Sequence, residues 1–431
     1  MDGLQRKHPQ LAESTQNYVI FMNLLYHFGF TEHFKSQQTY AVEPRFPSFF
    51  NKSPRILMPL NEMMTAVLPP KGHYKNHINH NPFPSDPLFI TGMGQEFDVI
   101  QSLQKPKRFS FLASDGKEYD WLIKDDLRID GLVMDFMSVM NDLMKNDSPC
   151  KQRGLKCKPY SVVPIGEDCG LIEWVPHLVP LRDTIFSIYQ LLGKKINVKK
   201  EIKKEQSSDQ KLEIFEKYWI PAHPPVLDYW FSLQFYREDA WYEACRQYVH
   251  STAVMSMIGY ILGLGDRHGG NLMLSVATGE LVHVDFNCLF NKGERLPWPE
   301  RVPFRLTQNM ISGMGVTGLE GAFVRVCELT LAVIRKNIGT LISVIRPIVF
   351  NVSRRDNLAK QKESDEEFIN GRMIANIDRV ILRMSGYIND RDCNHVANKA
   401  YSPQGHARAL IKMARDPKNL AQMYPGWGAF M

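Results

Sequence analysis

The sequence lacks the features that mark membrane proteins and disulfide-linked secreted proteins. Its most apolar early run, residues 18–30, is too short and too mixed to span a bilayer, and its polar N-terminus does not resemble a signal peptide. The seven cysteines are dispersed and form no CxxC pair, which argues against a zinc site and favours free thiols in a reducing compartment. We therefore expect a nuclear or cytoplasmic protein with no membrane span.

An excess of charge is also lacking. The 431 residues include 52 lysines and arginines against 46 aspartates and glutamates, which gives a net charge of +6. This mild basicity suits phosphate-bearing ligands, but it is too weak to indicate a direct nucleic-acid site. The lysine-rich stretch 194–204 is interpreted as solvated surface. Hydrophobic residues make up 44% and charged residues 23%, as in an ordinary globular protein, and the length allows two to three domain-sized units.

The first half of the chain has the pattern of a small α+β lobe. Segments 108–113 and 117–124 flank Asp115-Gly116, a dipeptide favoured in tight hairpin turns. The second strand alternates aromatic with polar residues, so Lys124 is expected to point to the face opposite the aromatics. A helix with one apolar face follows, and two short strands, 160–165 and 170–175, complete the lobe.

After this lobe the sequence is mainly helical. Residues 250–264 predict an apolar helix without proline, and residues 319–350 predict further helix. The highly charged stretch 351–372 predicts a mobile linker. Residues 313–318 match the pattern GxGxxG, but no strand precedes them. We therefore interpret them as a glycine loop before a helix and not as a dinucleotide site.

Residues with catalytic potential are concentrated in one short region. The apolar helix leads into the loop Gly265-Asp266-Arg267-His268-Gly269-Gly270-Asn271. Asp266 precedes Asn271 by five residues, which is the spacing of the catalytic aspartate and the metal-binding asparagine in the protein-kinase loop, although here the histidine follows the aspartate. Asp266 would accept or orient a hydroxyl proton, and His268 would donate to a transferring phosphoryl group.

The same region predicts a magnesium site. Strands 271–275 and 281–285 would form a hairpin centred on Thr278, which would place Asn271 directly opposite Asp285. One amide oxygen and one carboxylate oxygen, completed by phosphate oxygens and water, suit Mg²⁺, which takes few protein ligands. Mn²⁺ is a possible alternative.

The α+β lobe offers candidate phosphate-binding residues. Lys124 lies at the end of its strand, where its ammonium can bind phosphate and where Asp125 or Asp130 can hold it. The Asp-Gly hairpin would lie over the phosphates, with Ser114 and nearby backbone N–H groups as donors. For an isolated lysine, simple solvent exposure is the alternative interpretation.

The strand 170–175 is expected to join the two lobes and to meet the adenine base. Trp174 offers a flat face to the ring, and backbone groups near Glu173 and Val175 would read its edge. Packing in the hydrophobic core is the alternative for a tryptophan.

These residues resemble the phosphatidylinositol 3-kinase-related protein kinases. The matching motifs are GDRHGGN at 265–271, HVDFN at 283–287 and GLIEWV at 170–175. Longer runs, such as STAVMSMIGYILGLGDRH, VPFRLTQNMISGMG and AQMYPGWGAFM, are similar to the DNA-damage checkpoint branch of this family. The resemblance extends from about residue 41 to residue 431.

The resemblance implies an α+β, two-lobed protein-kinase-like fold. It divides the chain into the end of a FAT-like helical region at 1–40, an N-lobe at 41–173, a C-lobe at 174–350, a regulatory linker at 351–399 and a FATC segment at 400–431. It also implies an ATP-dependent serine/threonine kinase that acts in the nucleus on Ser/Thr-Gln sites of protein substrates after DNA damage or replication stress. The residue roles that it implies are Asp266 as base, His268 as phosphate stabiliser, Asn271 and Asp285 as metal ligands, Lys124 as phosphate ligand, Asp125 and Asp130 as the acidic positions that follow the lysine, and Trp174, Met273 and Val284 around adenine.

The chain departs from the family pattern at several places. The hairpin turn reads ASDG where the family has GSDG or GSNG, and the Lys124–Asp125 junction is about two residues shorter. Asn287 replaces the glycine of the DFG motif, which is usual in this branch. The long helical-repeat region of these kinases is absent, so we interpret the chain as a fragment, a truncated gene model or an unusual form. An ATRIP-like partner, which is expected to bind that region, is therefore not assumed here.

Two other functions are compatible with the same fold. A phosphatidylinositol lipid kinase would favour a strongly basic segment for its headgroup, but residues 286–305 carry four cations and two carboxylates, a net charge of only +2. A non-catalytic pseudokinase scaffold would not need the intact Asp266, Asn271, Asp285 and Lys124.

Overall fold

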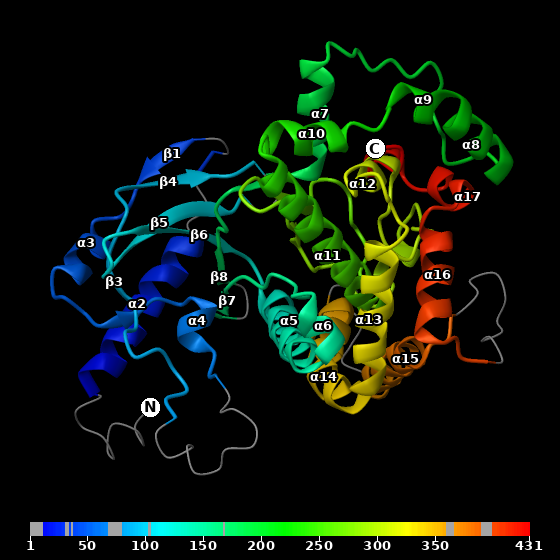
Figure 1. Ribbon diagram of the computed structural model, residues 1–431. Helices are drawn as coiled ribbons and strands as arrows, with labels where there is room; N and C mark the ends of the chain where they lie inside the picture. Colours follow the sequence, from blue (N-terminus) through cyan, green and yellow to red (C-terminus); the bar gives the residue numbers. More distant parts are fainter. Residues whose placement is uncertain are drawn as a thin grey trace. The chain divides into compact units, whose positions relative to one another are not determined.

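The computed structural model describes residues 12–30, 34–35, 38–67, 80–101, 105–166, 169–358, 366–388 and 399–431. The chain divides into two compact units (Figure 1). The first unit comprises residues 1–134 and 159–176, and the second comprises residues 135–158 and 177–431. Each unit has its own sheet, and each is described separately below.

The first unit is built on an antiparallel sheet with the strand order β1-β4-β5-β6-β8-β7, in which β3 pairs with both β5 and β2. Its strands are β1 (Thr39–Ala41), β2 (Ile56–Leu57), β3 (Phe89–Met93), β4 (Glu96–Val99), β5 (Lys107–Ala113), β6 (Glu118–Lys124), β7 (Val162–Pro164) and β8 (Gly170–Glu173). Its helices are α2 (Ala12–Phe30), α3 (Arg45–Phe50), α4 (Asn61–Met64) and the start of α5 (Arg128–Asn146).

The predicted hairpin is confirmed as β5 and β6. Phe109 lies opposite Trp121, and Gly116 takes the left-handed φ of +79° that the turn requires. The alternation along β6 is as predicted, because Trp121 is fully buried while Lys124 is half-buried on the opposite face.

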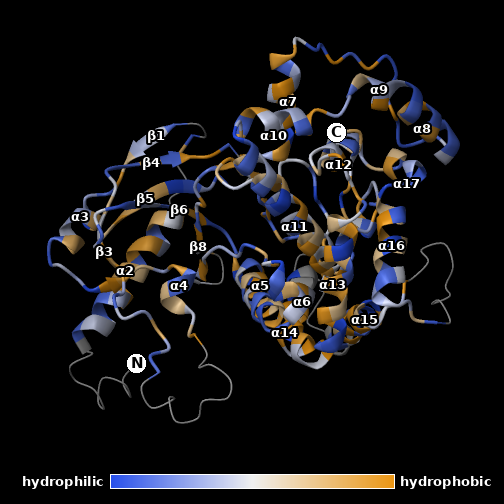
Figure 2. Cartoon of the chain, in the orientation of Figure 1, coloured by the Kyte–Doolittle hydropathy of each residue, from blue (hydrophilic) through white to orange (hydrophobic). Residues whose placement is uncertain are grey.

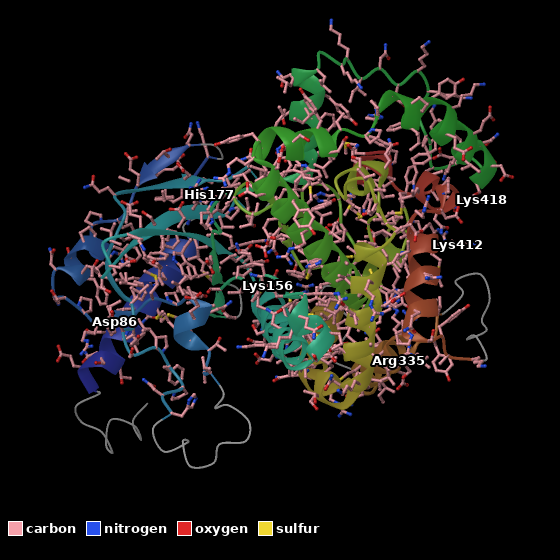
Figure 3. The ribbon with its side chains drawn as sticks, in the orientation of Figure 1. Asp86, Lys156, His177, Arg335, Lys412 and Lys418 are labelled. Carbon is pink, nitrogen blue, oxygen red and sulfur yellow. The ribbon has the colours of Figure 1, made fainter. Side chains whose placement is uncertain are left out.

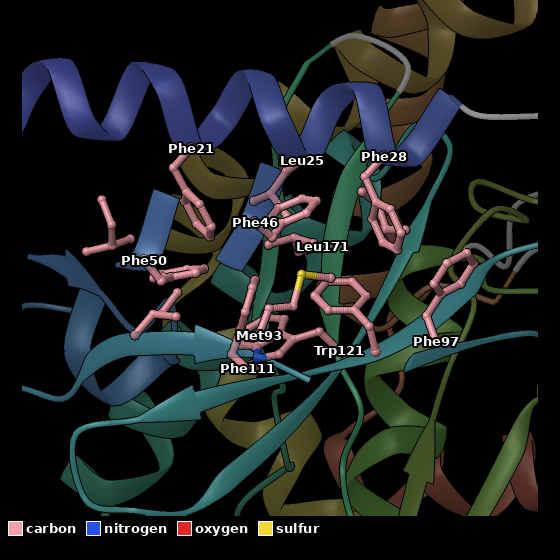
Figure 4. Close-up of a cluster of buried hydrophobic side chains, with 14 of the residues drawn as sticks. Phe21, Leu25, Phe28, Phe46, Phe50, Met93, Phe97, Phe111, Trp121 and Leu171 are labelled. Carbon is pink, nitrogen blue, oxygen red and sulfur yellow. The ribbon is translucent and has the colours of Figure 1, made fainter. Parts of the chain in front are cut away.

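The core of the first unit is an aromatic cluster between α2 and the sheet (Figure 4). Phe21, Leu25 and Phe28 recur at intervals of four and three residues along α2, so they lie on one face of the helix and point toward the strands. The ring of Phe28 makes edge-to-face contacts with Phe97 and Phe109, at centroid distances of 4.9 and 5.4 Å. Helix α2 is therefore an integral part of this core.

The second unit is mainly helical and carries a three-stranded sheet, β11-β10-β9. Its strands are β9 (Leu178–Pro180), β10 (Leu272–Ser275) and β11 (Leu281–His283). Its helical elements after α5 are α6 (Ser148–Gln152), α7 (Leu181–Leu191), α8 (Ser208–Ile214), η3 (Phe215–Trp219), α9 (Ile220–Ala222), α10 (Leu227–Gln234), α11 (Glu238–Leu262), η4 (Lys292–Arg295), α12 (Gln308–Ser312), α13 (Ala322–Lys336), α14 (Ile338–Leu358), α15 (Glu366–Ser385), α16 (Pro403–Ala414), α17 (Pro417–Ala421) and η5 (Pro425–Trp427).

Helix α11 is the central element of the second unit, and it contains the predicted apolar helix. All of its residues from Tyr248 to Leu262 are buried, and it ends at Gly263, whose φ of +60° forms a left-handed C-cap. Figure 2 shows polar and apolar residues side by side on α13 and α14, as expected for helices that are buried on one face only. The glycine loop 313–318 precedes α13 without a strand, as predicted.

The prediction of a linker over 351–372 is wrong for most of that stretch. Residues 351–358 are the last turns of α14, where Val352 and Ser353 are buried, and residues 366–372 begin α15. Burial of one face allows a charged sequence to remain helical. Residues 359–365 lie outside the described residues.

The cysteines and lysines of the chain lie in different environments. The six described cysteines are buried free thiols, while Cys393 lies outside the described residues. In Figure 3, Lys412 on α16 and Lys418 on α17 carry part of the surface charge. Of the helices that the structure describes, none is long and apolar enough to cross a membrane.

Candidate active site

The loop after α11 holds Asp266 in an uncommon backbone conformation. Asp266 has a φ of +58°, a left-handed value that costs a non-glycine residue about 1–3 kcal/mol. Its backbone N–H donates to Oε1 of Glu300 at 2.8 Å, while its side chain is exposed. An exposed carboxylate on a firmly held backbone can accept a proton from a bound hydroxyl group.

The buried side chain of Arg267 holds the loop through hydrogen bonds to backbone carbonyls. Its side chain is only 3% exposed, and its guanidinium donates to three backbone carbonyls: Gly265 at 2.9 Å, Val284 at 2.7 Å, and Asp285. A guanidinium has five donors in a rigid fork, so one arginine can join two loops. Arg267 thereby ties the Asp266 loop to the segment that carries Asp285.

His268 is held in one tautomer. Its Nδ1 accepts a hydrogen bond from the backbone N–H of Gly270 at 3.0 Å, which leaves the ring proton on Nε2. Burial lowers the pKa of His268, and the nearby Asp266 carboxylate opposes that shift. A neutral imidazole with an Nε2–H group can donate a hydrogen bond to a phosphoryl oxygen.

The predicted register of the hairpin is wrong by one residue. Leu272 pairs with His283, so Asn271 lies opposite Val284, whose N–H donates to the Asn271 carbonyl at 3.1 Å. The N–H of Ser275 donates to the carbonyl of Glu280, so the loop between the strands has an even number of residues, 276–279, and the hairpin is centred between Val276-Ala277 and Thr278-Gly279. Asp285 lies one residue beyond the pairing and has a φ of +61°.

Asn271 and Asp285 each keep an oxygen available to a divalent metal ion in spite of this shift. Nδ2 of Asn271 donates to the carbonyl of Asp266 at 2.9 Å, which leaves its amide oxygen available as a ligand. Oδ1 of Asp285 accepts hydrogen bonds from the backbone N–H and the Nδ2 of Asn287, so Oδ2 is the oxygen available to a metal. Oxygen ligands suit a divalent cation whose shell is completed by phosphates and water.

Met273 and Val284 lie on the same face of the small sheet as Asn271. Asn271 and Met273 are two residues apart on one strand, and Val284 is opposite Asn271. Met273 and Val284 are half-buried, whereas Leu272 and Leu274 on the other face are buried. A partly open apolar surface beside the polar ligands suits a flat base.

Ser114 and Lys124 belong to the first unit. Ser114 is exposed, its N–H donates to the carbonyl of Phe89, and its hydroxyl oxygen accepts from the N–H of Phe89 at 3.1 Å. The hydroxyl proton is still available for donation. Lys124 is half-buried, and its pairing with Asp125 or Asp130 stays a prediction.

Asp125 and Asp130 differ in burial. Asp125 is exposed, whereas Asp130 is 3% exposed in the first turns of α5. Between them the chain turns sharply at Asp126, whose φ is +24° and whose carboxylate pairs with Arg128 at 2.9 Å.

Trp174 lies outside the hydrophobic core. Its side chain is 36% exposed, and the guanidinium of Arg108 lies 4.7 Å from its ring. Glu173 is engaged locally, because its carboxylate accepts from the N–H of Ser161 at 2.8 Å. Among the described residues the N–H of Val175 has no hydrogen-bond acceptor, so it is available to the edge of a base.

Several residues of the site were missed in the sequence. Glu300, Arg267, Asn287, Arg305 and Arg355 all hold backbone or side-chain atoms of the loops described above. Most of them come from distant positions, for which the sequence gives no local signal.

Comparison with known families accounts for this arrangement. The family model described as phosphatidylinositol 3- and 4-kinase matches residues 119–352, and the FATC domain model matches residues 401–431. The chain belongs to the phosphatidylinositol 3- and 4-kinase family. Membership implies the use of ATP and a divalent metal ion, and it agrees with the predicted two-lobed kinase-like fold of the α+β class.

Curated relatives are protein kinases named ATR and rad3, which agrees with the predicted branch of the family. The chain is 38% identical to the serine/threonine-protein kinase ATR of Drosophila melanogaster and 39% identical to that of Arabidopsis thaliana, over 88% and 86% of its length. It is 35% identical to protein kinase rad3 of Schizosaccharomyces pombe over 90% of its length. It spans only 14–16% of these relatives.

Solved structures are similar over almost the whole chain. The structure of the FAT and kinase domain of CtTel1 aligns with 98% of the present chain, at a TM-score of 0.75 and 26% sequence identity. The match covers 28% of the CtTel1 chain. The open conformation of CtTel1 matches equally well.

Proposed function

We propose that this chain is the catalytic region of an ATR-like serine/threonine protein kinase that transfers the γ-phosphate of ATP to Ser/Thr-Gln sites of nuclear proteins in DNA-damage and replication-stress signalling. The proposal is carried by one observation: the bonds of Asn271 and Arg267 hold Asp266, Asn271 and Asp285 together in one loop pair. The names of the relatives support a protein substrate.

Each residue has a defined role in this proposal. Asp266 accepts or orients the proton of the substrate hydroxyl, and Nε2–H of His268 donates to the phosphoryl oxygens. Asn271 and Asp285 hold Mg²⁺, with Mn²⁺ as an acceptable substitute. The ion supplies positive charge that neutralises phosphate oxygens. Met273 and Val284 contact the base.

The family resemblance also assigns nucleotide-binding roles to residues of the first unit. Lys124 binds phosphate through its ammonium group, and Ser114 donates through its hydroxyl group. Trp174 presents its ring to adenine, while backbone groups near Glu173 and Val175 read the edge of the base. Asp125 and Asp130 are the acidic positions that follow the lysine.

The lipid-kinase alternative is weakened by the location of Arg305. This residue is one of the four cations of segment 286–305, but it is 3% exposed and donates to the carbonyls of Trp427 and Gly428. Three cations against Glu294 and Glu300 leave a net charge of +1 for a headgroup. This is a poor match to a multiply phosphorylated lipid.

The decisive experiment offers three substrates to the purified chain with ATP and Mg²⁺: a Ser-Gln peptide, the matched Ser-Ala peptide and phosphatidylinositol vesicles. We expect transfer to Ser-Gln alone and its loss in Asp266→Ala. The control variant Asp183→Ala changes an exposed aspartate on α7 and should match the wild type. Transfer to lipid would favour the lipid kinase, and nucleotide binding without any transfer would favour the pseudokinase scaffold.

A further inference from the structure

Arg355, in the last turns of α14, contacts a single residue of the active-site segment. Its Nη1 donates to Oδ1 of Asn287 at 2.8 Å, and its Nη2 donates to the backbone carbonyl of Asn287 at 3.0 Å. The two residues are 68 positions apart in the sequence. The planar guanidinium fork matches two oxygens of one residue, a geometry that a lysine cannot reproduce.

This contact determines which way the Asn287 amide points. A guanidinium has only donors, so it must face the amide oxygen, and the NH₂ group is turned to the other side. There Nδ2 donates to Oδ1 of Asp285 at 2.7 Å, and the backbone N–H of Asn287 donates to the same oxygen at 3.2 Å. A rotated amide would instead bring its oxygen against the carboxylate, and the two acceptors would repel each other.

Asp285 needs this support for two reasons. Its backbone is in the left-handed region, which is strained for a non-glycine residue. Its side chain also has two oxygens that exchange places when the carboxylate rotates. The two donors of Asn287 engage Oδ1, so Oδ2 is presented consistently as the outer oxygen.

We infer that Arg355 is a positioning residue for the metal-binding carboxylate of Asp285 and that it acts through Asn287. This inference rests on the proposed function, because it assigns Asp285 to the metal. Residues that orient a metal ligand from behind commonly change metal affinity by about 10–100-fold when they are removed. Asn287, which occupies the position of the glycine in the DFG motif, thus connects Arg355 on helix α14 to Asp285 through hydrogen bonds.

The test measures metal binding directly. Binding of Mn²⁺ to the full 431-residue chain is followed by electron paramagnetic resonance in the presence of a non-hydrolysable ATP analogue, together with the Mg²⁺ concentration that gives half-maximal activity. We expect Arg355→Met to weaken Mn²⁺ binding by about 10–100-fold and to raise the Mg²⁺ requirement in parallel. Arg355→Lys should lie between it and the wild type.

A matched control is available one residue away. Arg354 is an exposed arginine on the same helix, and Arg354→Met removes the same charge without touching Asn287. It should bind Mn²⁺ within about twofold of the wild type. Equal weakening by Arg354→Met and Arg355→Met would overturn the inference, because it would attribute the effect to general charge.

A double-mutant cycle tests the route through Asn287. In an Asn287→Gly background, Arg355→Met should cause no further loss of Mn²⁺ affinity, because the side chain that connects Arg355 to Asp285 is already absent. An equal further loss in that background would overturn the inference. If Arg355→Met does not fold, Arg355→Lys and Asn287→Gly carry the same comparison.

Failure of the inference can be told apart from failure of the proposed function. A wild-type chain that binds neither Mn²⁺ nor the nucleotide analogue would contradict the assignment of Asn271 and Asp285 as ligands, and the inference with it. A wild-type chain that binds both, with Arg355→Met indistinguishable from it, would overturn the role of Arg355 alone.

Discussion

The backbone N–H of Asp266 donates to Oε1 of Glu300 across 34 residues of sequence. The carboxylate of Glu300 is packed closely on both sides. A Cβ added at Gly265 would lie 2.4 Å from its Oε2, and one added at Gly293 would lie 2.1 Å from it. Glu300 therefore holds the peptide of the candidate catalytic aspartate, and only glycine fits beside it.

Loss of this acceptor should slow phosphoryl transfer. An unsatisfied N–H in such a site costs about 1–3 kcal/mol, so Glu300→Ala should lower kcat by about 5–150-fold. Glu300→Gln keeps an acceptor oxygen and should remain within about threefold of the wild type. Steady-state kinetics with the Ser-Gln peptide would check this. Equal damage by both variants would show that the charge matters and not the acceptor.

The buried contact of Arg305 with the C-terminal segment should stabilise the second unit. Its guanidinium lies 4.5 Å from the Trp427 ring and donates to the carbonyls of Trp427 and Gly428 at 2.6 and 2.7 Å. Arg305→Met removes both donors, and we expect it to cost about 2–4 kcal/mol. Thermal denaturation would measure the loss. Lys412→Met, an exposed change on α16, is the control and should leave the midpoint unchanged.

Sequence patterns predicted the elements of this site better than the contacts between them. The Asp115-Gly116 turn, the apolar helix before Gly265 and the polar loop after it are local signals, and the structure contains all three. The hairpin register failed by one residue because the centre of a short loop depends on its backbone geometry, which composition does not encode. Glu300 and Arg355 were not predicted as partners, since contacts across 34 and 68 residues leave no periodicity.

The buried face of the helix at residues 12–30 could not be predicted from the sequence either. Phe21, Leu25 and Phe28 have helical spacing, but Tyr18 and Ile20 interrupt the pattern with exposed apolar side chains. A mixed stripe of this kind does not reveal which face is buried. The aromatic core of the sheet decides it (Figure 4).

Two buried histidines should make the second unit sensitive to acid. Burial lowers the pKa of His250 and of His406 to about 4, against 6.5 in the unfolded chain. Between pH 6.5 and 4 the unfolded chain therefore binds more protons, so stability falls as the pH falls through that window. His406→Leu should remove about 2 kcal/mol of the loss between pH 7.5 and 5. Denaturation midpoints at the two pH values test this, with exposed His177→Asn as the control.

Lys107 should couple α2 to the sheet in a pH-dependent way. Its ammonium donates to the carbonyls of Phe28 and Gly29 at the end of α2, and burial lowers its pKa to about 8. The unfolded lysine keeps its proton up to about pH 10.5, so stability should rise with pH between these values. Lys107→Met should abolish that slope and, because the carbonyls lose their donor, increase amide hydrogen exchange in α2. An unchanged slope would contradict the role of Lys107.

The contact between Arg305 and Trp427 also affects how the protein is made. The two residues are separated by 122 positions, and Trp427 with the segment up to Met431 is buried. At about 5–20 residues per second, a ribosome needs roughly 6–24 s to synthesise the stretch between them. During that interval Arg305, which also donates to the carbonyl of Arg267, lacks its acceptors at Trp427 and Gly428. The loop that holds Asp266 is therefore expected to gain its full support only after Trp427 and Gly428 have been synthesised.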